Sequence, residues 1–429
     1  LPRWRKRPES LTMTGSSVDQ LESLRQVVGV VREGNLFQQA KLEGTGLTTD
    51  FVSIEDFIAH CPFTTKDELA RDRLEHQPYG TNISFPLERY TRFHQTSGTK
   101  GEPMAWLDLP EDWEWMLGNW GRVLDAAGVK PGARCYFAFS FGPFLGFWTA
   151  FEAASRRGCL CMPGGGMSSE QRLRSILEQG AEYLFCTPTY ALRLAEVAAG
   201  RGMDVASSEI RKIIVAGEPG GSMPELRRRI SEAWGGVELF DHYGMTEVGP
   251  VAYETPGGEG GLRVILESYL AEVVCPTSGE PLGEAKQGEL VLTTLGRAGC
   301  PVLRYRTGDL VLPHWGEDEN GSPTLDLVGG ILGRVDDMIV VRGVNLYPTS
   351  VDAVVRRFEE VVEYQVVVDE TPTMTEVSVR AEASPKLSNS LEKALTEAFS
   401  LRIPVESVET GSLPRFEMKA QRWVRRDGK

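Results

Sequence analysis

Short apolar runs alternate with helical stripes between about Arg134 and Phe240, and this alternation most constrains the fold. The runs predict strands at residues 135–140, 159–162, 183–186, 212–215 and 237–240. Helical periodicity predicts helices at 144–155, at 170–178 and from Pro224 onward. Strands separated by helices form a parallel sheet with both faces covered. Ligands bind at the carboxyl ends of such strands, so we expect the chemistry in the loops after Val215 and Phe240.

The pattern changes twice further along the chain. Short β segments at 271–274, 289–294 and 301–304 predict a β-rich subdomain. After Gly333, helical stripes around Val351 and Leu391 alternate with strands at 366–368 and 377–379. The predicted fold class is therefore α/β. A large N-terminal domain, residues 1–333, contains the parallel sheet and the β-rich subdomain. A small α+β C-terminal domain, residues 334–429, has a size typical of a separate unit.

The composition excludes some classes of protein. A chain of 429 residues with a formal net charge of −14 lacks the basic footprint of a nucleic-acid binder. No apolar run approaches the ~20 residues that a membrane span needs, and no signal peptide is expected behind the basic first residues. The close pair Cys159 and Cys161 fits alternate residues of a buried strand better than a metal site. We expect a cytoplasmic protein without nucleic-acid or membrane partners.

Residues 96–101, which read TSGTKG, form the most distinctive loop of the chain. Glycines and hydroxyls allow backbone N–H groups and side chains to surround a polyphosphate closely. The spacing does not match the G-x-x-x-x-G-K-[ST] phosphate loop. A small-residue loop taken alone is more often an ordinary turn, so this segment gains weight only from its neighbours in the site.

Two further motifs follow predicted strands. AGEPG at 216–220 places glycines where a flat aromatic ring can lie against the backbone, although a simple strand-to-helix turn explains it equally well. YGMTE at 243–247 presents an aromatic ring, a hydroxyl and a carboxylate together. Tyr243 can stack on a base, and Thr246 can bond a phosphate. Glu247 can hold Mg²⁺, which prefers oxygen ligands.

Two more motifs lie near the predicted domain boundary. RYRTGD at 304–309 ends in Asp309, which can accept hydrogen bonds from ribose hydroxyls or serve as a turn aspartate. GRVDDM at 333–338 contains Arg334, which can neutralise a phosphate or bond a ribose. In the same segment Asp336 or Asp337 can absorb a backbone rotation. A solvated linker is the other explanation of this charged segment.

Taken in order, the five segments resemble the core motifs of the adenylate-forming superfamily of acyl-CoA synthetases and carrier-loading adenylation enzymes. LFCTPTYAL at 184–192 and LPRFEMKA at 413–420 resemble its phenylacetate–CoA ligase branch. The resemblance covers the chain from about Tyr90 to its end. It implies an enzyme that converts ATP and a carboxylic acid into an acyl-adenylate and pyrophosphate. The thiol of coenzyme A, or of a carrier-protein phosphopantetheine, then attacks the adenylate.

The resemblance also implies roles for individual residues. The phosphates of ATP contact Thr96, Ser97, Gly98, Thr99 and Gly101. The nucleoside part of ATP or AMP is held by Gly217, Glu218, Pro219, Asp241, His242, Tyr243, Gly244 and Met245. Thr246 meets the α-phosphate and Glu247 is the Mg²⁺ ligand. Asp309 takes the ribose hydroxyls, with Arg334 nearby.

Lys419 is implied to be the catalytic lysine of adenylation, acting with Thr246 and Glu247. Members of this family have a mobile small domain that rotates between the two half-reactions. Asp336 is then the hinge, and Gly343 lines the thiol tunnel. A glycine suits a place where a thin pantetheine arm passes close to the backbone.

The chain departs from the family pattern in the phosphate loop, where Lys100 and Glu102 stand, and at Gly220, where the branch commonly has a tryptophan. The aromatic residues Tyr136, Phe139 and Phe141 predict a pocket for an apolar or aryl acid, although core packing explains them equally well. No zinc ligands follow YGMTE, so no structural zinc is expected. Three interpretations stay open: an acid–CoA ligase, an enzyme that loads a carrier protein, and a non-catalytic nucleotide-binding protein. The sequence also leaves open whether the protein forms a homodimer.

Overall fold

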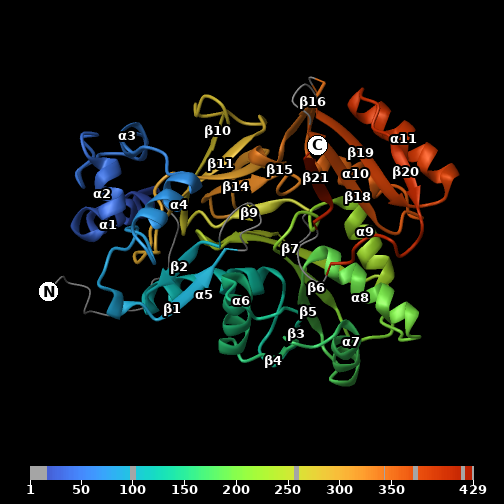
Figure 1. The fold of residues 1–429 in the computed structure, drawn as a ribbon. Coiled ribbons are helices and arrows are strands. Elements are labelled where there is room, and N and C mark those ends of the chain that lie inside the picture. The colour runs from blue at the N-terminus through green and yellow to red at the C-terminus, as the bar shows by residue number, and fades with distance from the viewer. Residues whose placement is uncertain are drawn as a thin grey trace.

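The computed structural model describes residues 17–96, 103–255, 260–342, 344–370, 375–416 and 421–427. A large body carries a smaller C-terminal unit at one end (Figure 1). Its helices are α1 (Ser17–Gly34), α2 (Leu36–Leu42), α3 (Ile54–His60), α4 (Lys66–Glu75), α5 (Pro110–Ala126), α6 (Leu145–Arg156), α7 (Ser169–Glu178), α8 (Pro188–Gly200), α9 (Pro224–Ala233), α10 (Pro348–Val355) and α11 (Pro385–Phe399). In the described ranges no helix combines the length and apolarity that crossing a membrane requires.

A nine-stranded mixed sheet runs through the large body. Its order is β13 (Pro313–Glu317), β14 (Pro323–Leu327), β9 (Leu262–Val264), β8 (Gly249–Glu254), β7 (Glu238–Met245), β6 (Lys212–Val215), β5 (Tyr183–Cys186), β3 (Arg134–Phe137) and β4 (Leu160–Pro163). The strands from β7 to β4 pair in parallel, which confirms the predicted parallel sheet. Buried apolar residues pack it against α5 and α6 on one face and against α7, α8 and α9 on the other (Figure 1).

Strand β7 is longer than the sequence predicts. The expected loop after Phe240 is wrong, because β7 continues beyond it and pairs antiparallel with β8 through a bulge. A Cβ atom on Gly244 would lie 2.8 Å from the Gly249 carbonyl oxygen, so only glycine fits the close approach of these two strands. Thr246 and Glu247 occupy the turn between β7 and β8. A tight hairpin therefore carries this motif.

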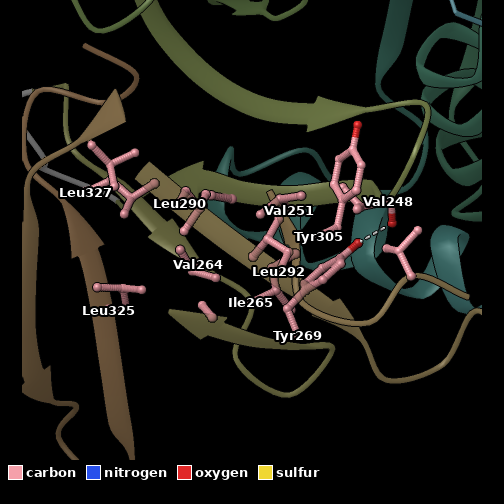
Figure 2. Packing of buried hydrophobic residues seen from close by; sticks show 14 of the residues in the cluster. Val248, Val251, Val264, Ile265, Tyr269, Leu290, Leu292, Tyr305, Leu325 and Leu327 are labelled. Atoms are coloured by element: carbon pink, nitrogen blue, oxygen red, sulfur yellow. Dashed lines mark hydrogen bonds between the residues drawn. The ribbon is translucent and has the colours of Figure 1, made fainter. Parts of the chain in front are cut away.

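Four strands form a second sheet, in the order β10 (Tyr269–Val274), β11 (Gly288–Thr294), β12 (Tyr305–Val311) and β15 (Gly333–Arg334). Figure 2 shows the core it shares with the central sheet, where Leu290 and Leu292 of β11 pack with Val251 of β8. The Tyr269 side chain lies in this core, and its hydroxyl donates to the Val248 carbonyl oxygen at 2.8 Å (Figure 2). The core thereby anchors the β7–β8 turn.

The predicted strand at 301–304 is wrong, since β12 begins one residue later. Arg304 adopts a left-handed φ of 43°. Its guanidinium donates to the buried Glu272 carboxylate at 2.9 Å and to the carbonyl oxygens of Ile58 and Cys61. These bonds hold the end of α3 against the second sheet. The sequence patterns did not predict the N-terminal helices.

The small C-terminal unit is built on the sheet β20 (Val405–Val408), β19 (Thr375–Glu382), β18 (Tyr364–Glu370) and β21 (Trp423–Asp427), with a hairpin of β16 (Ile339–Val341) and β17 (Val344–Leu346). It lies beside α9 (Figure 1). Arg228 of α9 forms an ion pair with Glu359 of the small unit at 2.6 Å. A 3₁₀ turn at Val335–Asp337 follows β15 directly. The division between residues 333 and 334 stays a prediction, and this turn lies just beyond it.

Candidate active site

Part of the predicted site lies outside the described residues. That part contains Ser97, Gly98, Thr99, Lys100, Gly101, Glu102, Gly343 and Lys419. Thr96 is described and lies buried between β1 (Arg92–Gln95) and β2 (Ala105–Asp108). Its backbone N–H donates to the Met104 carbonyl oxygen, and its hydroxyl oxygen accepts from the Met104 N–H, both at 2.9 Å. The β1–β2 hairpin therefore brings the two ends of the phosphate loop together.

Two predicted nucleotide-binding residues, Tyr243 and Arg334, contact a third, Asp309. This buried carboxylate accepts a hydrogen bond from the Tyr243 hydroxyl at 2.6 Å and from Arg334 Nη1 at 2.9 Å. Arg334 also donates through Nε to Asp336 at 2.9 Å, so the predicted hinge residue joins the network. Burial raises the pKa of Asp309 to about 6, although the Arg334 charge opposes this rise. The structure thus brings together residues from β7, β12 and β15.

The backbone explains why Arg334 reaches Asp309. The two residues face each other in the antiparallel pairing of β12 with β15. Gly308 precedes Asp309 with a left-handed φ of 75°, and a Cβ atom there would lie 2.9 Å from Arg334 Nη2. The left-handed conformation favours glycine at this position, and the missing side chain leaves room for the guanidinium.

Glu247 is a buried carboxylate with an unexpected neighbour. Lys66 Nζ lies 3.4 Å from its Oε1. Lys66 is the first residue of α4, and half of its side chain is exposed. Sequence reasoning missed it, because its only local signal is the capping box that Thr65 and Glu68 form around the start of the helix. The charge of Glu247 also helps to raise the pKa of Asp309, so both carboxylates belong to one electrostatic site.

The predicted adenine loop is anchored by α8. The Glu218 carboxylate accepts hydrogen bonds from the backbone N–H of Thr189, at 2.8 Å, and from its hydroxyl. Gly220 has a left-handed φ of 133°, and a Cβ atom there would lie 2.6 Å from Leu226 Cδ2. This geometry explains the departure from the family pattern, since no tryptophan fits at Gly220. The roles of Gly217, Glu218 and Pro219 toward adenine stay predictions.

Asp241 and His242 are buried beneath this loop, in β7. Asp241 accepts from the Ser222 hydroxyl at 2.6 Å, and burial raises its pKa to about 7. The His242 Nδ1 atom lies 2.9 Å from the Ala252 carbonyl oxygen, and burial lowers the pKa of His242 to about 4. Both side chains are occupied by internal contacts, Asp241 with Ser222 just after the loop and His242 with β8.

The three predicted pocket residues belong to two faces of the central sheet. Tyr136 packs in the core cluster of α7 and α8, whereas Phe139 and Phe141 pack with α5 and α6. The Phe141 ring contacts Trp148 with a centroid distance of 5.2 Å. A Cβ atom on Gly164 would touch Tyr136, and one on Gly165 would lie 3.2 Å from Phe141. Tyr136 and Phe141 therefore meet at one glycine-rich loop.

Two family models match the chain. The AMP-binding enzyme model matches residues 96–298, and the AMP-binding enzyme C-terminal domain model matches residues 343–426. The phenylacetate-coenzyme A ligase of Thermus thermophilus is 34% identical over 369 residues, which cover 85% of this chain and 81% of that protein. Similarity thus extends over most of both chains.

Solved structures of 2-hydroxyisobutyryl-CoA ligase share the fold. In its postadenylation state with R3-HIB-AMP, this ligase gives a TM-score of 0.90 at 26% identity, covering 99% of this chain and 94% of its own. In its thioesterification state with 2-HIB-AMP and CoA, the TM-score is 0.72 at 27% identity, covering 95% and 89%. On these matches and the site geometry, the chain belongs to the adenylate-forming, AMP-binding superfamily, in its phenylacetate–CoA ligase-like branch, and is an AMP-forming acid–CoA ligase.

Proposed function

We propose that this enzyme activates an aryl or apolar carboxylic acid with ATP and Mg²⁺ and transfers the acyl group to CoA. The observation that carries the proposal is the buried network of Tyr243, Asp309 and Arg334 beside Glu247. It offers carboxylate oxygens to ribose hydroxyls and places a second carboxylate nearby for a metal ion. The aromatic residues Phe139 and Phe141 support an apolar acid.

In the first half-reaction, a carboxylate oxygen of the acid attacks the α-phosphorus of ATP, and the bond to pyrophosphate breaks. Thr246 donates a hydrogen bond from its hydroxyl to the α-phosphate, and Asp309 orients the ribose. Glu247 is a suitable ligand for Mg²⁺, which takes one or two carboxylates and completes its shell with phosphate oxygens and water. Bound there, the ion supplies positive charge to the phosphates. In the second half-reaction, the CoA sulfur attacks the acyl carbon and AMP leaves.

The small domain supports an alternation between these steps. The solved 2-hydroxyisobutyryl-CoA ligase matches this chain with a TM-score of 0.90 in its postadenylation state and 0.72 in its thioesterification state. We infer that the arrangement described here belongs to the adenylation side of the cycle. Rotation about Asp336 then exchanges it for a thiol-accepting arrangement in which Gly343 lines the tunnel. The Arg228–Glu359 ion pair is a contact that this rotation must break.

The proposal extends to location and acceptor. A cytoplasmic enzyme agrees with the seven cysteines, all within the described ranges and all free thiols. A carrier protein as acceptor and a homodimer remain alternatives. Transfer assays with CoA and with a carrier protein, and the mass of the enzyme in solution, decide between them.

Pyrophosphate release tests the proposed function. Purified enzyme, ATP and Mg²⁺ are combined with a panel of aryl, aliphatic and hydroxy acids, each with and without CoA. We expect release to depend on the acid and to be fastest with aryl or apolar acids. A panel in which no acid gives ATP-dependent release would falsify the proposal, and preference for a small polar acid removes the assigned substrate class.

Lys66→Ala should raise the KM for ATP about 10-fold, because the ammonium beside Glu247 lies where the phosphates are proposed to bind and a bond to a charged group contributes about 1.5–3 kcal/mol. Steady-state pyrophosphate release at varied ATP concentration measures the change. The matched control is Arg71→Ala, which removes an exposed cation from the same helix. An effect as large in the control as in Lys66→Ala contradicts a specific phosphate contact.

A further inference from the structure

A buried guanidinium joins two parts of the active site. Arg297 lies between β11 and β12, and neither its side chain nor that of Asp108 is exposed. We propose that Arg297, oriented by Asp108, is a positioning residue for Thr246 and Glu247. The inference rests on the proposed function, because that function gives Thr246 and Glu247 their roles at the phosphates.

The first set of contacts fixes the β7–β8 turn. Arg297 Nη1 donates to the carbonyl oxygens of Thr246 at 2.7 Å and of Glu247 at 2.8 Å. The Tyr269 hydroxyl donates to the carbonyl oxygen of Val248 at 2.8 Å. Three successive carbonyl groups of the turn are therefore held by buried side chains. Because the backbone of the turn is held, the directions in which the Thr246 and Glu247 side chains leave it are set as well.

The second contact reaches the phosphate-loop hairpin. Arg297 Nε donates to Asp108 Oδ1 at 2.7 Å, and Asp108 is the last residue of β2. The guanidinium lies over the Trp106 ring of the same strand, 5.0 Å from its centroid. A charge-assisted hydrogen bond is strong in a buried environment. The phosphate-loop hairpin and the β7–β8 turn therefore cannot move apart without breaking either this ion pair or the hydrogen bonds of Arg297 to the turn.

Asp112, in the first turn of α5, holds the Arg297 segment from another side. Its carboxylate accepts from the backbone N–H groups of the two residues that follow Arg297, at 2.7 Å and 3.1 Å. Burial raises the pKa of Asp112 to about 7, and the charge of Asp108 adds to the rise. His94 of β1 contributes a further neighbour, with Nδ1 3.6 Å from Asp108 Oδ2. The position of the guanidinium is thus defined by its backbone as well as by its partners.

A purely structural role for this ion pair makes a different prediction. A buried ion pair can often be replaced by apolar residues of similar volume with little loss of stability. A pair that only stabilises the fold is therefore replaceable without loss of activity. A pair whose donor groups orient Thr246 and Glu247 is not replaceable in that way.

The first test is Arg297→Lys, which keeps the charge and loses the planar fork of donors. The two half-reactions are measured separately, as pyrophosphate release and as CoA transfer from a synthetic acyl-adenylate. We expect kcat for adenylation to fall about 10- to 100-fold and the Mg²⁺ concentration for half-saturation to rise, with CoA transfer within about twofold of the wild type. The matched control is Arg263→Lys, which alters a bidentate pair with Asp326 in the outer strands of the central sheet and should change neither rate.

The double variant Asp108→Leu/Arg297→Met separates positioning from folding. We expect its thermal midpoint to stay within about 4 °C of the wild type, while adenylation remains slow. Recovery of adenylation together with stability overturns the inference. So does an Arg297→Lys enzyme with unchanged rates, or with an equal fall in both half-reactions. A wild-type enzyme that releases no pyrophosphate with any acid overturns the proposed function, and this inference with it.

Discussion

Replacing Lys419 with alanine should lower the rate of acyl-adenylate formation about 10²- to 10³-fold and leave transfer from a supplied acyl-adenylate to CoA unchanged. In the adenylation step a carboxylate oxygen approaches phosphorus, so negative charge gathers between two anions. An ammonium group is a compact charge that stabilises this transition state. Lys419 lies outside the described residues, so the expectation rests on the LPRFEMKA motif and on family membership.

The matched control is Lys393→Ala, which removes an exposed lysine of α11 in the same small domain. Both half-reactions should keep their wild-type rates in this variant. Pyrophosphate release and CoA consumption measure the two steps independently. If Lys419→Ala slows both steps to the same extent, the proposed alternation of the small domain is contradicted, because a lysine withdrawn for the second step cannot contribute to it.

The parallel core is the part of the fold that the sequence shows most directly. The apolar runs at 183–186 and 212–215 coincide with β5 and β6, because a strand covered on both faces is apolar along most of its length. The second half of β7 could not be predicted from the sequence, since Asp241 and His242 are polar and suggest a loop. They remain in the strand because the Ser222 hydroxyl and the Ala252 carbonyl group satisfy them inside the protein.

The candidate site also contains some residues that could be predicted from the sequence and others that could not. Tyr243, Asp309 and Arg334 could be predicted because they lie in motifs whose order along the chain is itself informative. Lys66 and Arg297 could not, since a single cation in a helix or a loop has no local pattern. Only the fold brings these two cations to Glu247, one to its carboxylate and the other to its carbonyl group.

Asp309 has opposite effects on activity and stability between about pH 4 and pH 6. Its pKa is raised by burial from the ordinary 3.8 to about 6, so the folded protein holds the proton over a range in which the unfolded chain has lost it. The contribution of Asp309 to the free energy of unfolding is therefore fully present below 3.8 and is lost as the pH rises through 6. Ribose binding needs the ionised carboxylate, so activity rises through the same range.

Asp309→Asn should raise the KM for ATP about 10²-fold, because two bonds from ribose hydroxyls to a carboxylate contribute about 1.5–3 kcal/mol each. The substitution also leaves the Arg334 guanidinium without its buried ionic partner. The acidic limb of kcat/KM near pH 6, measured by pyrophosphate release, should disappear in this variant. It should persist in Asp326→Asn, which alters an arginine–aspartate pair in the outer strands of the central sheet. An acidic limb that is the same in wild type and Asp309→Asn shows that the ionisation of another group governs ATP binding. Asp241, whose pKa is raised to about 7, is then the candidate for that group.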